Sequence, residues 1–259
     1  MTSRLARVRV TAGYSIVLVA VATILGRLDP AVRDRVIQHA STNLHNLGRG
    51  HVGTLLGSAL VVDAGPVLYW LPGLVCLLAL GELLWRSGRL VVAFAVGHVG
   101  ATLLVAAGLT AAVAHGWSSP DVIRATDVGM SYGATAVLGA ITAALPRRWR
   151  LTWIGWWLAA AIAVVGVGAD FTDVGHLLSL ILGMLVATRF GVPRPWTPAM
   201  VVLLLGVAAP YGFLVLANGE GTPVPAAAWG VVGAVLGAVL TGLVGWARAG
   251  RQRNRTADA

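Results

Sequence analysis

Residues 129–145, GMSYGATAVLGAITAAL, place a serine at the start of an apolar run that contains no charged residue. A second run, residues 174–190, VGHLLSLILGMLVATRF, places a histidine close to its own start. Polar and ionisable groups inside a bilayer are costly, so each is a candidate functional group. A hydroxyl and an imidazole at one depth are also the two components of a nucleophile–base pair. Whether Ser131 meets His176 therefore bears directly on what the protein does.

The composition indicates an all-α polytopic membrane protein. Of the 259 residues, 57% are hydrophobic and only 11% are charged, whereas a soluble domain has about 25% charged residues. The sequence pI is about 11.3, which by itself is typical of nucleic-acid-binding proteins. Here the arginines lie at the ends of apolar runs, where membrane topology requires them, so we expect no nucleic-acid partner.

A helical membrane span needs about 20 mostly apolar residues, and the sequence contains eight such runs. They predict a six-helix core in residues 1–190, two additional transmembrane helices in residues 191–247 and a basic cytoplasmic tail in residues 248–259. No small-residue cleavage site follows the first run, so we interpret it as an uncleaved helix. The predicted spans are residues 10–26, 66–85, 90–113, 129–145, 151–168, 174–190, 198–217 and 226–246.

The charges predict the orientation of these spans. All 19 basic residues are arginine, and an arrangement with the N-terminus inside puts 14 of them on the inner side. The same arrangement puts 8 of the 10 acidic residues on the outer side. Cytoplasmic loops carry an excess of basic residues, so both termini are expected in the cytoplasm. The Arg-only, Ala/Gly/Val-rich composition is typical of a high-GC bacterium, so we expect the bacterial plasma membrane.

One outer segment, residues 27–65, is longer than a simple connection. Loops of more than about 12–15 residues usually have their own structure or a function, and short amphipathic pieces at the outer interface are expected here. His39, His45 and His51 are six residues apart and therefore do not share a helical face. Because the close ligand spacing of a metal site is missing, we predict no metal and no cofactor.

Small residues accompany both candidate catalytic residues. Ser179 and Gly183 share a helical face with His176, and Gly129 and Gly133 flank Ser131. Membrane helices approach one another closely through such residues, so contact between the two helices is expected.

These features together resemble the rhomboid intramembrane serine proteases over residues 10–190. That family has Gly-x-Ser at the outer end of its fourth helix, as in residues 129–131, and a histidine followed by small residues in its sixth, as at His176. It also has a long outer loop after the first helix, and a glutamate like Glu82 at the inner end of the second.

The resemblance implies that Ser131 is the nucleophile and His176 its general base. It implies an enzyme that cleaves transmembrane protein substrates in the lipid bilayer, near the outer membrane face. The residues expected to form the oxyanion site or to pack around the pair are Gly129, Gly133, Ser179 and Gly183.

The chain also departs from the family pattern. Residues 66–85 contain neither the histidine nor the asparagine that usually assists the oxyanion, Tyr132 replaces a glycine, and Thr135 replaces an aromatic residue. A catalytically inactive rhomboid-like protein that binds membrane clients is therefore an alternative, and a small-solute transporter is a third. Asp173 is either an orienting carboxylate for His176 or a solvated charge, and His98 has no assigned role.

Overall fold

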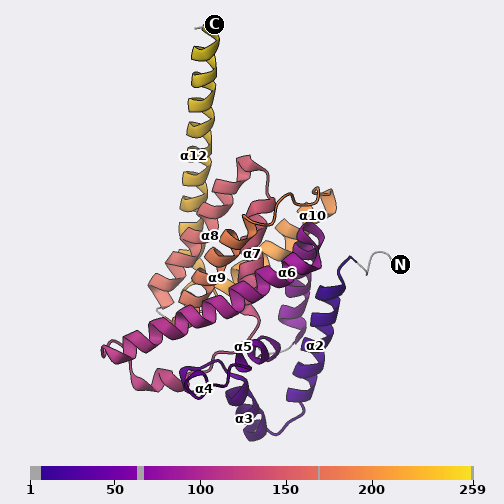
Figure 1. The fold of residues 1–259 in the computed structure, drawn as a ribbon, viewed down its shortest axis with the longest axis vertical. Coiled ribbons are helices and arrows are strands. Elements are labelled where there is room, and N and C mark those ends of the chain that lie inside the picture. Colours follow the sequence, from indigo (N-terminus) through magenta and orange to yellow (C-terminus); the bar gives the residue numbers. More distant parts are fainter. Residues whose placement is uncertain (1–6, 63–66, 169, 258–259) are drawn as a thin grey trace.

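The computed structural model describes residues 7–62, 67–168 and 170–257, with side chains up to residue 247. Every regular element within these ranges is a helix (Figure 1), which confirms the all-α class. Two short elements are 3-10 helices, η1 (Ser58–Leu60) and η2 (Pro120–Arg124), and η3 (Leu204–Ala208) is a turn of π-helix. The α-helices are α2 (Arg9–Leu25), α3 (Pro30–Ala40), α4 (Leu44–Gly48), α5 (Thr54–Gly57), α6 (Val67–Ala114), α7 (Ser131–Ala144), α8 (Arg147–Gly168), α9 (Phe171–Ala187), α10 (Pro198–Leu203), α11 (Ala209–Leu216) and α12 (Pro223–Ala257).

The predicted spans coincide with the apolar helices. Every one falls on an apolar helix, the second and third both on α6. Four helical stretches are long and apolar enough to cross a membrane: Val67–Ala114, Arg147–Gly168, Pro198–Leu216 and Pro223–Ala247. The shorter apolar helices are α2, α7 and α9.

Local sequence signals explain several helix starts. Asp29 caps α3 through the N–H of Ala31, and Pro30 supplies the first helical residue without losing a hydrogen bond. Asp170 caps α9 and Thr197 caps α10 in the same way.

Helix α6 contains a sharp change of direction at Arg86. Its φ of 68° and ψ of 162° are not helical, and they separate the two spans that the sequence predicts. The carboxylate of Glu82 lies beside this point and accepts hydrogen bonds from Ser87, from the N–H of Val10 and from both N–H and hydroxyl of Thr11. Glu82 therefore fixes the start of α2 to the bend in α6.

The helix ends that carry arginine gather on one side of the bundle. The N–H of Arg194 donates to Leu84 O beside the bend, and the indole of Trp196 donates to Ala144 O at the end of α7. The glycines of α12 contact α8 in antiparallel order, so α12 ends on the side where α8 begins. We call this side the arginine-rich end, defined by Arg9, Arg86, Arg89, Arg147, Arg148, Arg150, Arg189 and Arg194.

The opposite side, the outer-loop end, consists of residues 27–62 and 115–130. Figure 1 shows α3, α4 and α5 there, away from both termini. The start of α2 and the end of α12 therefore lie on one side of the bundle, as an even number of spans requires. The predicted helical pieces of the long outer loop are present as α3, α4, α5 and η1; residues 63–65 of that loop lie outside the described range.

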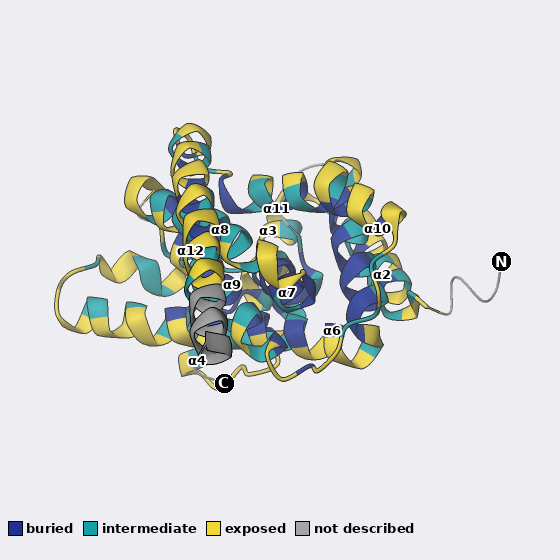
Figure 2. Cartoon of the chain, turned by 90° about the horizontal axis from the view of Figure 1, so that it is seen from above, coloured by how far each residue is buried: buried dark blue, intermediate teal, exposed yellow. Residues whose placement is uncertain are grey.

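Helix α7 lies at the centre of the bundle. Every residue from Tyr132 to Thr142 is buried, and Figure 2 shows the dark buried positions concentrated around it.

Helix α12 continues to Ala257, beyond the predicted end at residue 246. Residues 248–257 are rich in helix-forming Arg, Gln and Ala and contain no proline, so nothing stops the helix. The side chains of the predicted basic tail lie outside the described residues.

Candidate functional site

Ser131 is the first residue of α7, and the outer loop fixes its position. Gly129 has a φ of 123°, a conformation that favours glycine, and its N–H donates to Ser58 O at 2.9 Å. Ser131 itself is half-buried. Within the described part of the chain its hydroxyl has no hydrogen-bond partner, so the group is uncommitted.

A second set of hydrogen bonds ties the outer loop to the segment before Ser131. The N–H of Asp127 donates to Ser41 Oγ at 2.8 Å, and the Thr42 hydroxyl donates to Asp127 Oδ2 at 3.0 Å. The N–H of Thr42 donates to Asp127 O. Burial of this carboxyl raises its pKa, assisted by the negative charge of Asp170, while the Thr42 hydrogen bond opposes the shift.

Helices α7 and α9 run parallel with their backbones in contact. A Cβ added at Gly183 would overlap Ala136 O, and one added at Gly139 would overlap Leu180 O. The hydroxyl of Ser179 donates to Tyr132 O. The small-residue contact predicted between these two helices is therefore present, and both candidate residues belong to its outer-loop half.

His176 lies in the buried part of this contact, with 4% of its surface exposed. The Tyr132 ring packs edge-on against it, with ring centroids 5.3 Å apart and an interplanar angle of 82°. Among the described residues neither ring nitrogen of His176 has a hydrogen-bond partner. Ser131 and His176 thus occupy the same end of adjacent helices without a hydrogen bond between them.

The carboxylate of Asp173 is not an orienting partner of His176 in this structure. Asp173 is buried, and its Oδ2 lies where a Cβ at Gly168 would be. Both nitrogens of His176 are without a partner among the described residues. The alternative of a freely solvated end charge does not hold either, because Asp173 is only 6% exposed.

Gly133, another of the glycines predicted to pack around the pair, lets α7 pack closely against α6. A Cβ there would overlap the ring of Phe94 in the second half of α6. A Cβ at Gly97, one turn along, would lie 2.9 Å from Ser179 Oγ and overlap Ala136 Cβ. The second half of α6, α7 and α9 therefore converge just below Ser131.

His98 is a residue of this region to which the sequence assigned no role. Its Nε2 is 3.1 Å from Ser58 Oγ, and its ring centroid is 6.5 Å from that of Tyr132. It therefore lies beneath the same loop residue that holds Gly129. A histidine within an apolar span was a signal in the sequence, but its partner Ser58 is distant in the chain.

No metal centre is formed by the described residues. No group of three His, Cys, Asp or Glu side chains among them is close enough to hold an ion. His39, the first histidine of the outer loop, is bonded to Arg35 O at 2.7 Å.

The sequence pattern of the rhomboid-like proteins matches residues 7–194, which is most of the chain. The chain belongs to the rhomboid-like family. This membership and the apolar helices establish a multi-pass membrane protein with a rhomboid-like core followed by α10–α12. Neither a curated protein nor a solved structure matches it.

The rhomboid-like family gives a common explanation for features far apart in the chain. The match begins before α2 and ends at Arg194, so it includes the outer loop, Glu82 and the α7–α9 contact. Helices α10, α11 and α12 follow the matched region, as the two additional C-terminal spans were expected to do.

Proposed function

We propose that this rhomboid-like protein is an intramembrane serine endopeptidase that cleaves transmembrane protein substrates with a Ser131–His176 dyad. The observation that carries the proposal is the position of these residues at one end of two parallel helices whose backbones touch. In that arrangement the hydroxyl and the imidazole belong to adjacent helices at the same end of the bundle.

The chemistry follows the usual order for a serine nucleophile. His176 accepts the proton of Ser131 Oγ as the oxygen attacks the scissile carbonyl carbon. His176 then gives this proton to the leaving amine, which releases an acyl-serine. Water, deprotonated by His176, hydrolyses that ester and regenerates Ser131.

The backbone of α7 supplies part of the oxyanion site. Its first N–H groups have no acceptor within the helix, and the Ser131 N–H is one of them. Such a donor stabilises the oxygen anion of the tetrahedral intermediate. Gly129, Gly133, Ser179 and Gly183 support the dyad by setting the loop entry and the close helix contact.

The missing hydrogen bond between the dyad residues is compatible with this proposal. Catalytic hydrogen bonds are often long or unformed without substrate and tighten in the reacting complex. Neither nitrogen of His176 is committed to another described residue, so no existing bond has to break.

The charge distribution supports an orientation for the reaction. The arginine-rich end faces the cytoplasm by the positive-inside rule, with both termini there. The outer-loop end, and Ser131 with it, then faces outward in a bacterial plasma membrane. We propose residues 1–190 as the catalytic core, 191–247 as the two added spans and 248–259 as a cytoplasmic tail.

A fluorophosphonate probe tests the nucleophile directly. Purified full-length protein should be labelled covalently, whereas Ser131→Ala and His176→Ala should lose labelling on the order of a thousandfold or more. Ser119→Ala, an exposed serine on the same side, is the matched control and should label like the wild type. Equal labelling of all four proteins would refute the dyad.

A second candidate function is binding of membrane clients without catalysis. The observation that favours it is the Tyr132 ring, which occupies the space against His176. This function predicts that a captured single-span client stays uncleaved and co-purifies equally with wild type and Ser131→Ala. Cleavage that disappears in Ser131→Ala would reject it.

A further inference from the structure

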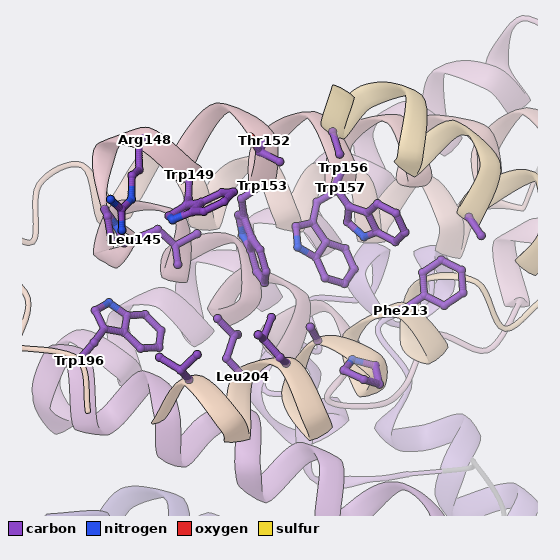
Figure 3. A pocket seen from close by; sticks show the side chains of 17 residues that line it. Leu145, Arg148, Trp149, Thr152, Trp153, Trp156, Trp157, Trp196, Leu204 and Phe213 are labelled. Atoms are coloured by element: carbon purple, nitrogen blue, oxygen red, sulfur yellow. The ribbon is translucent and has the colours of Figure 1, made fainter. Parts of the chain in front are cut away.

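A large apolar groove lies between α8, η3–α11 and α12, at the arginine-rich end and far along the bundle from Ser131. Its volume is about 930 Å³. Figure 3 shows indoles from α8 above it and the η3–α11 segment below it. Its aromatic lining includes Trp149, Trp153, Trp156, Trp157 and Trp196.

The groove exists because α11 and α12 pack against different helices of the bundle. Gly233 of α12 packs against Gly155 of α8 so closely that a Cβ on either would overlap backbone. Tyr211 of α11 packs instead on Gly73 in the first half of α6. The face of α8 that carries Arg148 and the tryptophans is therefore left open between them.

The mouth of the groove carries one uncommitted positive charge. Arg148 lines the groove and is exposed, with its guanidinium 6.0 Å from the Trp149 ring centroid. Arg150 and Arg194 nearby donate to backbone carbonyls. Arg148 has no hydrogen bond or ion pair to the described residues, and it lies in the first turn of α8, where anions are favoured.

Unpaired donors lie further inside. The indole N–H groups of Trp153 and Trp157 are buried without an acceptor among the described residues. Trp153 is five residues beyond Arg148, which is about 7.5 Å along a helix. Both N–H groups are enclosed by protein, so the groove presents the apolar ring surfaces of these tryptophans to its occupant.

We propose that this groove binds one anionic phospholipid from the leaflet at the arginine-rich end. The phosphate pairs with Arg148, and an acyl chain lies along the indoles toward Phe213. A cation at the mouth and apolar walls behind it match the phosphate and the acyl chain of such a lipid.

A transmembrane helix is a poorer match for the same space. Close packing of membrane helices is favoured by stripes of small residues, and this lining presents large rings. A second copy of the chain would meet the same obstacle. The proposal does not depend on proteolysis, because the groove is remote from Ser131 and its test uses no substrate.

Tryptophan quenching by brominated lipids provides the test. Full-length protein in bilayers of phosphatidylcholine should be quenched more at low fractions of brominated phosphatidylglycerol than of brominated phosphatidylcholine. Arg148→Gln should reduce this preference about tenfold, the effect of losing one hydrogen bond between charged groups in the groove. Arg147→Gln is the matched control, since it neutralises the adjacent arginine, which does not line the groove.

A second pair of variants tests the groove itself. Ala234→Leu fills it from α12 and should lower retention of phosphatidylglycerol in native mass spectrometry of the detergent-purified protein. Val235→Leu, on the exposed face of α12, should not. Quenching that ignores lipid charge, or retention that is equal in both variants, would overturn the proposal. So would a stable dimer that Ala234→Leu dissociates.

Discussion

At the scale of single residues, Tyr132 connects the features of the candidate site. Its ring contacts His176, its carbonyl accepts from Ser179, and its ring also approaches His98. Its own hydroxyl has no partner among the described residues. The residue after the candidate nucleophile therefore contacts both histidines of this region and Ser179.

Tyr132→Phe should leave the fold intact and raise the free energy of unfolding by about 1 kcal/mol or leave it unchanged. The reason is that an unpaired buried hydroxyl is removed while the ring packing against His176 is kept. Thermal unfolding in detergent measures this. Tyr132→Ala is the comparison and should lose about 3–5 kcal/mol by leaving a cavity. A Phe variant as unstable as the Ala variant would show that the hydroxyl has a partner.

Asp127 predicts a pH dependence in the loop before Ser131. Because burial raises the pKa of this carboxyl, the folded loop prefers its neutral form. Below the unfolded-state pKa of about 4 the carboxyl is neutral in both states, so its burial does not reduce the free energy of unfolding. As pH rises through the folded-state pKa the buried carboxyl becomes charged, and the free energy of unfolding falls. Asp127→Asn should remove this dependence.

Hydrogen exchange of the Gly129 and Thr42 amides, which donate to Ser58 O and Asp127 O, measures this effect across about pH 4 to 7 after correction for intrinsic exchange rates. Protection should decrease with rising pH in the wild type and stay level in Asp127→Asn. Asp121→Asn, in the exposed η2, is the control. Protection that rises with pH in the wild type would contradict the assigned direction.

At the scale of helices, the α7–α9 contact depends on glycines that leave no space for a side chain. Gly183 opposes Ala136 O, and Gly139 opposes Leu180 O. Because α7 is buried along its length, it has nowhere to move when a methyl group is inserted. The same contact holds together the helices that carry the two candidate catalytic residues.

Gly183→Ala should therefore destabilise the protein by about 1–3 kcal/mol, the usual cost of overpacking. It should also reduce probe labelling of Ser131, since the helices separate. Gly166→Ala in α8 has open space around it. This control should be neutral or stabilising by up to about 1 kcal/mol, because alanine is the better helix former. Equal unfolding of both variants would argue against a close contact.

At the scale of the whole molecule, the arginines and the outer loop lie at opposite ends of one bundle. The single cysteine, Cys76, lies in α6. A Cys76→Ala background therefore allows single reporters to be placed at either end.

Ser119→Cys should react with an impermeant maleimide in intact cells, whereas Thr188→Cys should react only after lysis. The physical reason is the excess of arginine at the end near Thr188. Both positions are exposed in the fold, so accessibility differs only by side of the membrane. The reverse pattern would invert the orientation and place Ser131 on the cytoplasmic side.

The sequence by itself determined the class and the order of the helices. Apolar length set the spans, since a bilayer satisfies backbone groups only within helices. The small residues around Ser131 and His176 were also apparent, because spacing along a helix fixes which residues share a face. The resemblance placed Glu82 at the inner end of the second span, and the structure added the bend beside it.

Only the tertiary structure decided which groups meet across long stretches of chain. Three contacts join residues of different elements: Tyr132 against His176, Ser58 with His98, and Thr42 with Asp127. The hydrophobic periodicity within one helix does not predict such contacts. The groove beside α8 likewise forms because α12 packs on α8, whereas α11 packs on α6. Side-chain packing between helices set these contacts, whereas periodicity within each helix set the spans.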